Sequence, residues 1–166
     1  MVAAMGMNLG EKPAILTRGS DLETLMPTVR PQVYRAMKKD ADDKPTVDQT
    51  ATGLGVRPGT DINIDAAGNV VLDDNGMSVA PRWRDLELHR IPKRLGTIVP
   101  GARGSNNTHC FTTGAGPFQR DPFAQGLELI PDTVIHAAVA PIAAVPLAQY
   151  EANLASTCPD WVIDEI

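Results

Sequence analysis

The sequence predicts a single α+β domain that is rich in strands and has only short helices. Its 166 residues are within the range of one domain and are enough to enclose a hydrophobic core. The 14 glycines and 14 prolines are spread along the chain, which keeps helices short and makes turns frequent. Short apolar segments recur between these turns, as they do in strands. We therefore expect one domain over 1–166, with packed β-sheets and short flanking helices.

The N-terminal part contains one predicted helix and one predicted strand. Ser20 and Glu23 have the spacing of a capping box, and Pro27 ends the short helix that they would begin. Val33–Met37 is a short, bounded apolar segment and predicts a strand. The polar segment 38–59, which contains proline and glycine, predicts a loop.

The clearest strand pattern follows this loop. Ile62 and Ile64 alternate with polar residues, as in a half-buried strand. The segment 66–76 contains two turns around the apolar residues Val70–Leu72, which predict the returning strand of a hairpin. The second turn leads into a further predicted strand at Met77–Ala80.

The second half of the chain predicts more strands and one helix. The segment 81–104 is irregular and basic. Three strands are expected after it, at His109–Thr113, Leu127–Ile130 and Val134–Val139. Pro146 suits the first turn of a helix, and Pro159 blocks its continuation. One face of this helix is formed by Leu147, Tyr150, Glu151 and Leu154. Trp161 is expected to pack back on the core.

Charge and cysteine content limit the functional classes. The formal net charge of −5 gives no overall attraction for nucleic acid, so no strong nucleic-acid binding is expected. Basic residues are nevertheless concentrated in one segment: Arg82, Arg84, Arg90, Lys93, Arg94 and Arg103. This cluster is either a solvated face or a cradle for a phosphate-bearing ligand. Two cysteines are too few for a disulfide framework, which favours a reduced, cytosolic setting.

The sequence predicts neither a membrane protein nor a metal site. It has no positively charged leader, and no apolar run approaches the ~18 residues of a membrane helix, so any export is expected to be independent of a signal peptide. Asp61, Asn63 and Asp65 imitate the first half of a calcium loop, but Ala66 and Leu72 replace its glycine and its glutamate. The three histidines lack the spacing of zinc ligands.

Two short segments point to a function. Val33-Tyr-Arg-Ala36 places Arg35 on a predicted strand beside an aromatic residue. Later in the chain, Asn75-Gly-Met-Ser-Val79 places Ser78 on a predicted strand just after a glycine turn. In this order and spacing, the two segments resemble the arginine–serine branch of the ADP-ribosyltransferase superfamily. In that branch, the arginine and the serine flank a cleft that binds NAD.

More narrowly, the chain resembles the Tse-two family of toxins that are exported by type VI secretion. The resemblance covers about residues 31–163 and leaves 1–30 as an N-terminal extension. Besides the two segments above, the second of which extends back to Asp73, it is carried by Gly55-Val-Arg-Pro58 with Asp61-Ile62, His136-Ala-Ala-Val-Ala-Pro141, Val145-Pro-Leu-Ala-Gln-Tyr-Glu-Ala-Asn-Leu154 and Trp161.

The resemblance implies an α+β, ADP-ribosyltransferase-like fold of two packed, bent β-sheets that bind NAD as a substrate. Breaking the bond between nicotinamide and ribose develops positive charge on the ribose, which a carboxylate normally stabilises. Arg35 is expected at a phosphate or the ribose, and Ser78 at the nicotinamide side. His136 is a third catalytic candidate. The residues expected to line the NAD site are Tyr34, Arg35, Met77, Ser78 and Arg90. Glu128 and Glu151 are the late candidates for the carboxylate.

The same resemblance implies partners and a location. A toxin that is made in the cytoplasm and acts in the cytoplasm of a recipient cell requires a cognate immunity protein, and an acidic inhibitor could dock on the basic segment Arg82–Arg103. Contacts with the secretion apparatus are also expected. Two alternatives remain open at this point. One is a toxin of this fold that blocks a target by binding, and the other is an unrelated interaction domain.

Overall fold

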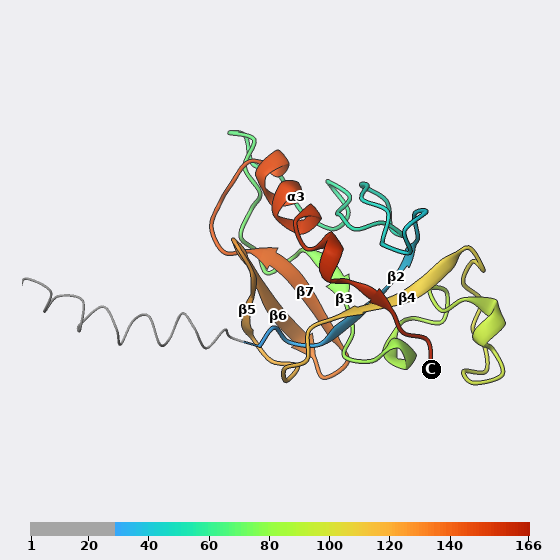
Figure 1. Ribbon diagram of the computed structural model, residues 1–166. Helices are drawn as coiled ribbons and strands as arrows, with labels where there is room; N and C mark the ends of the chain where they lie inside the picture. The colour runs from blue at the N-terminus through green and yellow to red at the C-terminus, as the bar shows by residue number, and fades with distance from the viewer. Residues whose placement is uncertain (1–28) are drawn as a thin grey trace, which may run out of the picture.

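Two antiparallel β-sheets and one short α-helix make up the part of the chain that the structure, a computed structural model, describes, residues 29–166 (Figure 1). The three-stranded sheet has the order β2-β4-β8, with β2 at Val33–Lys38, β4 at Thr108–Thr113 and β8 at Val162–Ile163. The four-stranded sheet has the order β3-β7-β6-β5, with β3 at Met77–Val79, β7 at His136–Pro141, β6 at Leu127–Thr133 and β5 at Asp121–Ala124. The helices are α3 at Leu147–Ala155 and three 3-10 turns, η1 at Trp83–Asp85, η2 at Lys93–Leu95 and η3 at Cys158–Asp160. The predicted α+β class is confirmed.

Most strands and the C-terminal helix lie at the positions predicted from the sequence. The strands expected to begin at Val33, Met77, His109 and Leu127 are found with bounds that shift by up to three residues. The strand expected at Val134–Val139 instead begins at His136, because residues 134–135 form the turn of the β6–β7 hairpin. The helix expected after Pro146 begins at Leu147. The helix expected between Ser20 and Pro27 lies outside the described residues.

The hairpin expected over residues 62–72 is present only as a turn with a single bridge, without the two expected strands. Ile64 and Val70 form only an isolated bridge, and neither belongs to a strand. Two backbone hydrogen bonds flank this bridge, from Asp65 N–H to Asn69 O at 2.8 Å and from Val71 N–H to Asn63 O at 2.9 Å, whereas the N–H of Val70 points outward and donates to Val145 O at 2.8 Å. Ile62 and Val70 still enter the core, which explains their apolar character.

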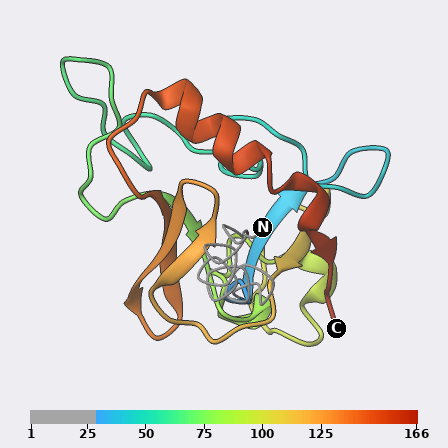
Figure 2. The same ribbon diagram turned by 60° about the vertical axis from the view of Figure 1, so that its left-hand side comes forward.

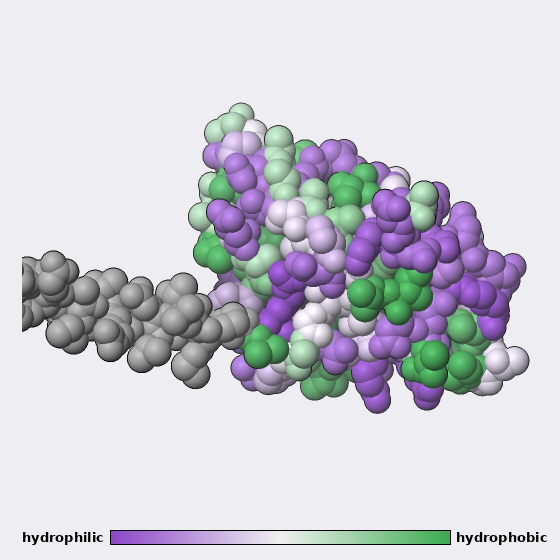
Figure 3. Space-filling model, viewed as in Figure 1, coloured by the Kyte–Doolittle hydropathy of each residue, from purple (hydrophilic) through white to green (hydrophobic). Residues whose placement is uncertain are grey.

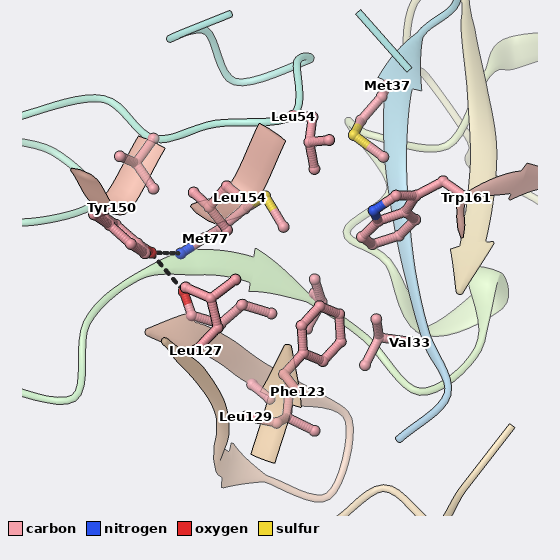
Figure 4. Close-up of a cluster of buried hydrophobic side chains, with 14 of the residues drawn as sticks. Val33, Met37, Leu54, Met77, Phe123, Leu127, Leu129, Tyr150, Leu154 and Trp161 are labelled. Atoms are coloured by element: carbon pink, nitrogen blue, oxygen red, sulfur yellow. Dashed lines mark hydrogen bonds between the residues drawn. The ribbon is translucent and has the colours of Figure 1, made fainter. Parts of the chain in front are cut away.

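The main core fills the space between the sheets and under α3 (Figures 1 and 2). In the ladder, Met77 lies opposite Val139 and Val139 opposite Leu129, so one face of the four-stranded sheet is apolar. Residues of both sheets, of α3 and of the C-terminal segment meet in this core, among them Val33, Met37, Leu129, Leu154 and Trp161 (Figure 4). Trp161 is fully buried, as predicted, and its Nε1 donates to Thr157 Oγ1 at 2.9 Å.

Tyr150 connects α3 to the four-stranded sheet. Its hydroxyl accepts from the backbone N–H of Met77 at 3.2 Å and donates to Val139 O at 2.5 Å (Figure 4). Burial raises the pKa of this hydroxyl, so it stays protonated and can make both bonds. Gly76 is required beside it, because a Cβ there would lie 2.3 Å from Val139 O.

The segment 81–104 forms a second, smaller core on the outer face of the three-stranded sheet. Tyr34, Trp83, Ile91 and Cys110 are its buried members, and partly buried apolar residues of the segment pack against them. The segment has no strand and only two 3-10 turns, in agreement with the irregular structure expected from its sequence.

Candidate functional site

A pocket of ≈ 270 Å³ lies where β2 meets β3, and we call it the junction pocket. Tyr34 and Ala80 join the two strands there by reciprocal backbone hydrogen bonds of 2.7 and 3.0 Å. Its walls are largely apolar, formed by Ala36, Ala51, Val79, Ala80, Leu86 and Ile135. Its polar lining residues are Arg35, Ser78, Asp85, Glu87, Arg90, Thr133 and His136. Apolar walls with a few convergent polar groups are typical of a ligand site.

Arg35 lies in the wall of this pocket and is held by backbone carbonyls. It occupies the same face of β2 as the core residues Val33 and Met37, so its side chain enters the protein and is 5% exposed. Its guanidinium donates to four carbonyl oxygens: Gly53 at 3.1 Å, Ser78 at 2.9 Å, Ala51 at 3.3 Å and Gly55 at 3.5 Å.

These bonds use most of the donors of Arg35. A guanidinium has five N–H groups, and four of them are directed at the protein itself. Burial, together with the nearby charge of Arg90, lowers the pKa of Arg35 to about 10, so it is still a cation at neutral pH. Arg35 therefore shapes the pocket by tying the loop 51–55 to β3, and it has little capacity left for the phosphate or ribose contact expected from the sequence.

Ser78 presents its side chain to the pocket from the centre of β3. It lies opposite Ala138 of β7, on the face of the sheet that points away from the main core. Its carbonyl is bonded to Arg35, whereas its hydroxyl makes no hydrogen bond within residues 29–166. The half-buried hydroxyl is therefore available to a ligand in the junction pocket.

His136 lies at the start of β7 and is paired with a carboxylate. Its Nδ1 lies 2.6 Å from Asp132 Oδ1, across the tip of the β6–β7 hairpin. Burial by itself would raise the pKa of Asp132, but the hydrogen bond and charge of His136 outweigh it and hold the pKa below its usual value. The pair has the form of a general base oriented by a carboxylate.

Arg90 and Glu87 also line the junction pocket. Arg90 Nη1 donates to Ala51 O at 2.8 Å, and its Nε lies 3.9 Å from Glu87 Oε1. Glu87 is the most solvent-accessible carboxylate of the lining, with 72% of its side chain exposed. The other lining carboxylate, Asp85, accepts two hydrogen bonds from the guanidinium of Arg82. Sequence reasoning missed Glu87 as a site residue, because an isolated glutamate in a basic loop carries no local signal.

Tyr34 and Met77, the two other residues expected at the NAD site, do not line the pocket. Tyr34 points to the outer face of β2, where its hydroxyl donates to Asp164 Oδ2 at 2.7 Å. Met77 is 1% exposed and packs in the main core. Strand alternation explains both positions, because residues next to Arg35 and Ser78 face the other side of their strands.

The two glutamates considered from the sequence have different surroundings. Glu128 lies on the same face of the four-stranded sheet as Ser78, where its Oε1 accepts from Arg120 Nε at 3.3 Å. It lines a different pocket, at the far end of that face. Glu151 belongs to α3, which covers the opposite face of the sheet, and one of its carboxylate oxygens is buried without a hydrogen-bond partner.

Internal contacts occupy much of the basic segment 82–103. Arg82 is paired with Asp85, and Arg94 Nη2 contacts Glu165 Oε2 at 2.6 Å. Arg84 lies over the ring of Trp83, with its Cζ 5.3 Å from the ring centroid. The segment thus presents less unpaired positive charge than its composition indicates.

Within residues 29–166, no group of His, Cys, Asp and Glu is arranged to hold a metal ion. No helix of this part of the chain has the length and apolarity needed to cross a membrane. Comparison of the chain with protein-family models, curated proteins and solved structures finds no match.

Proposed function

We propose that the chain is a growth-arresting toxin with an ADP-ribosyltransferase-like fold, which binds NAD in the junction pocket and breaks the bond between nicotinamide and ribose. One observation carries the proposal. Ser78, Arg90 and His136, three residues selected from distant parts of the sequence, line a single pocket that Arg35 helps to shape. The resemblance of the Arg35 and Ser78 segments to the arginine–serine transferases supplies the reaction.

The size of the pocket fits part of NAD. Its ≈ 270 Å³ is near the lower end of the roughly 300–1,000 Å³ typical of small-molecule sites. A second pocket of ≈ 300 Å³ shares Ala36, Ala51 and Arg90 with it and adds Arg57 and His89. The nicotinamide and its ribose would occupy the junction pocket, the phosphates would lie at Arg90, and the adenosine would extend into the second pocket.

Each polar group has a distinct role in this proposal. The hydroxyl of Ser78 orients the nicotinamide amide by a hydrogen bond, and Arg90 binds phosphate with the N–H groups that do not contact Ala51. Glu87 supplies the negative charge that stabilises the ribose as the bond breaks. The bond between ribose C1′ and the nicotinamide nitrogen breaks with its electrons leaving on nicotinamide, and the acceptor bonds to C1′. His136, oriented by Asp132, takes the proton that the acceptor loses.

The direct test is to incubate the purified protein with NAD and to measure the released nicotinamide by chromatography. Wild type should release nicotinamide, and Ser78→Ala and Glu87→Gln should each lower the rate on the order of a hundredfold, because each removes one contact made in the transition state. Asp43→Asn, on a surface turn away from the pocket, serves as the matched control and should keep the wild-type rate.

Growth of bacteria that express the protein separates the alternatives. Arrest that Ser78→Ala and Glu87→Gln abolish supports NAD chemistry. Arrest by wild type without nicotinamide release, retained in both variants, would refute the enzymatic proposal and favour a toxin that acts by binding. Normal growth with wild type would refute the toxin proposal itself.

A further inference from the structure

A groove follows the face of the four-stranded sheet that points away from the main core. Its floor is formed by cross-strand neighbours, because Ser78 lies opposite Ala138 and Ala138 lies opposite Ile130. Two adjoining pockets, of ≈ 140 and ≈ 160 Å³, lie along this floor and share Asp74, Asn75 and Ile130. We call the two together the sheet groove. It is continuous with the junction pocket, which shares Ser78 and His136 with it.

The charge of the sheet groove is predominantly negative. Four carboxylates line it: Asp61, Asp74, Glu128 and Asp132. Two of them have an arginine partner, since Arg57 contacts Asp61 at 2.9 Å and Arg120 contacts Glu128 at 3.3 Å. Asp132 is paired with His136 and not with an arginine, and the carboxylate of Asp74 makes no hydrogen bond within residues 29–166. The whole chain adds to this excess with its net charge of −5.

Both ends of the sheet groove carry exposed apolar side chains. Leu72 and Ile142 line one end and are 53% and 52% exposed. At the other end, the tip of the β6–β7 hairpin presents Val134 and Ile135, which are 87% and 48% exposed. On the face seen in Figure 3, hydrophobic residues form small patches set among hydrophilic ones. Exposed apolar residues that flank a charged groove are typical of a protein-binding surface.

We propose that the sheet groove binds a basic segment of a partner protein. Arginine or lysine side chains of the segment would meet Asp74 and Asp132, the two carboxylates without an arginine partner. An apolar residue at one end of the segment would cover Leu72 and Ile142, and one at the other end would cover Val134 and Ile135. Negative potential in a groove selects a cationic partner and speeds its association, whereas the apolar ends supply contact area. This proposal does not depend on NAD chemistry.

Two fluorescein-labelled peptides test the proposal by fluorescence anisotropy in the absence of NAD. One has leucine at both ends and alternating arginine and serine between them, and in the other glutamate replaces each arginine. The basic peptide should bind at low salt and weaken as salt rises, because the Debye length falls from roughly 30 Å at 0.01 M to about 8 Å at 0.15 M. Equal binding of the two peptides, or none of the basic one, would overturn the proposal.

Matched variants then locate the binding surface. Asp74→Asn combined with Asp132→Asn should weaken binding of the basic peptide about tenfold or more. Asn suits position 74, where φ is 65°, so the fold is kept. Asp42→Asn combined with Asp43→Asn is the control, because it removes the same charge from a turn outside the groove and includes a residue with φ of 59°.

The apolar ends are tested separately by Leu72→Ser, with Val47→Ser as its control at a similar exposure of 49%. Leu72→Ser should weaken binding several-fold at both low and high salt, and Val47→Ser should not. If either control variant weakens peptide binding as much as the groove variant with which it is compared, the sheet groove is refuted as the binding surface. Because no arm of the experiment contains NAD, its outcome and that of the nicotinamide assay are independent.

Discussion

Replacing Arg35 by methionine should destabilise the protein strongly, whatever reaction it performs. Methionine keeps much of the apolar length of the side chain but removes all four hydrogen bonds to the carbonyls of Gly53, Ser78, Ala51 and Gly55. The bonds to Gly53 and Gly55 are buried, so these two acceptors would lose their partner away from water. Each buried acceptor left unpaired costs about 1–3 kcal/mol.

The burial of a cation partly offsets that cost. The folded protein desolvates the guanidinium, as its lowered pKa of about 10 indicates, and methionine removes this penalty. Two buried acceptors at about 1–3 kcal/mol each give about 2–6 kcal/mol, and the offset places our expectation for Arg35→Met near 3 kcal/mol. For a chain of 166 residues, 1 kcal/mol shifts the thermal midpoint by roughly 2–4 °C, so we expect a decrease of roughly 6–12 °C.

Urea unfolding measures this free energy directly. Trp161 in the main core and Trp83 in the smaller core report on both regions by fluorescence. Arg35→Lys is the informative second variant. Lysine keeps the charge but lacks the planar array of N–H groups of a guanidinium, so it should recover only part of the lost stability. A change in unfolding free energy of less than about 0.5 kcal/mol in Arg35→Met would refute the structural role of Arg35.

Three further predictions concern stability and reactivity. Ser78→Ala should change the unfolding free energy by less than about 0.5 kcal/mol in a urea titration, because the hydroxyl has no partner among the described residues; a loss above about 2 kcal/mol would contradict its availability to a ligand. Tyr150→Phe should cost about 1–3 kcal/mol by the same assay, since it leaves two backbone groups unpaired. Hydrogen bonds from Arg57 hold the pKa of Asp61 below its usual value of 3.8 although burial opposes them, so its stabilisation is present above pH 3.8 and is lost as the pH falls further. Thermal midpoints measured from pH 7 to pH 2.5 should therefore fall less steeply below pH 4 in Asp61→Asn than in wild type, and parallel curves would contradict this assignment.

Local patterning was enough to predict most of the fold. Apolar alternation and bounding turns predicted the central strands, and Pro146 predicted the start of α3. Sequence reasoning failed where the deciding contact is distant. The hairpin over residues 62–72 forms a single bridge, and Val70 donates on its outer side to the distant Val145. The strands β5 and β8 were missed, since one contains Pro122 and the other has only two residues, and both exist through pairing with a neighbouring strand.

For the candidate site, too, local sequence patterns predicted some features, and distant contacts decided the others. The sequence by itself determined that Arg35 and Ser78 lie on strands, because strand formation follows from the residues around them. Only the tertiary structure decided what these side chains meet: four carbonyls surround Arg35, while Ser78 faces a pocket that also receives Arg90 and His136. It also brought Glu87 to the rim of that pocket. The physical reason is that periodicity specifies which face of a strand a residue occupies, whereas the groups that it meets come from segments distant in the chain.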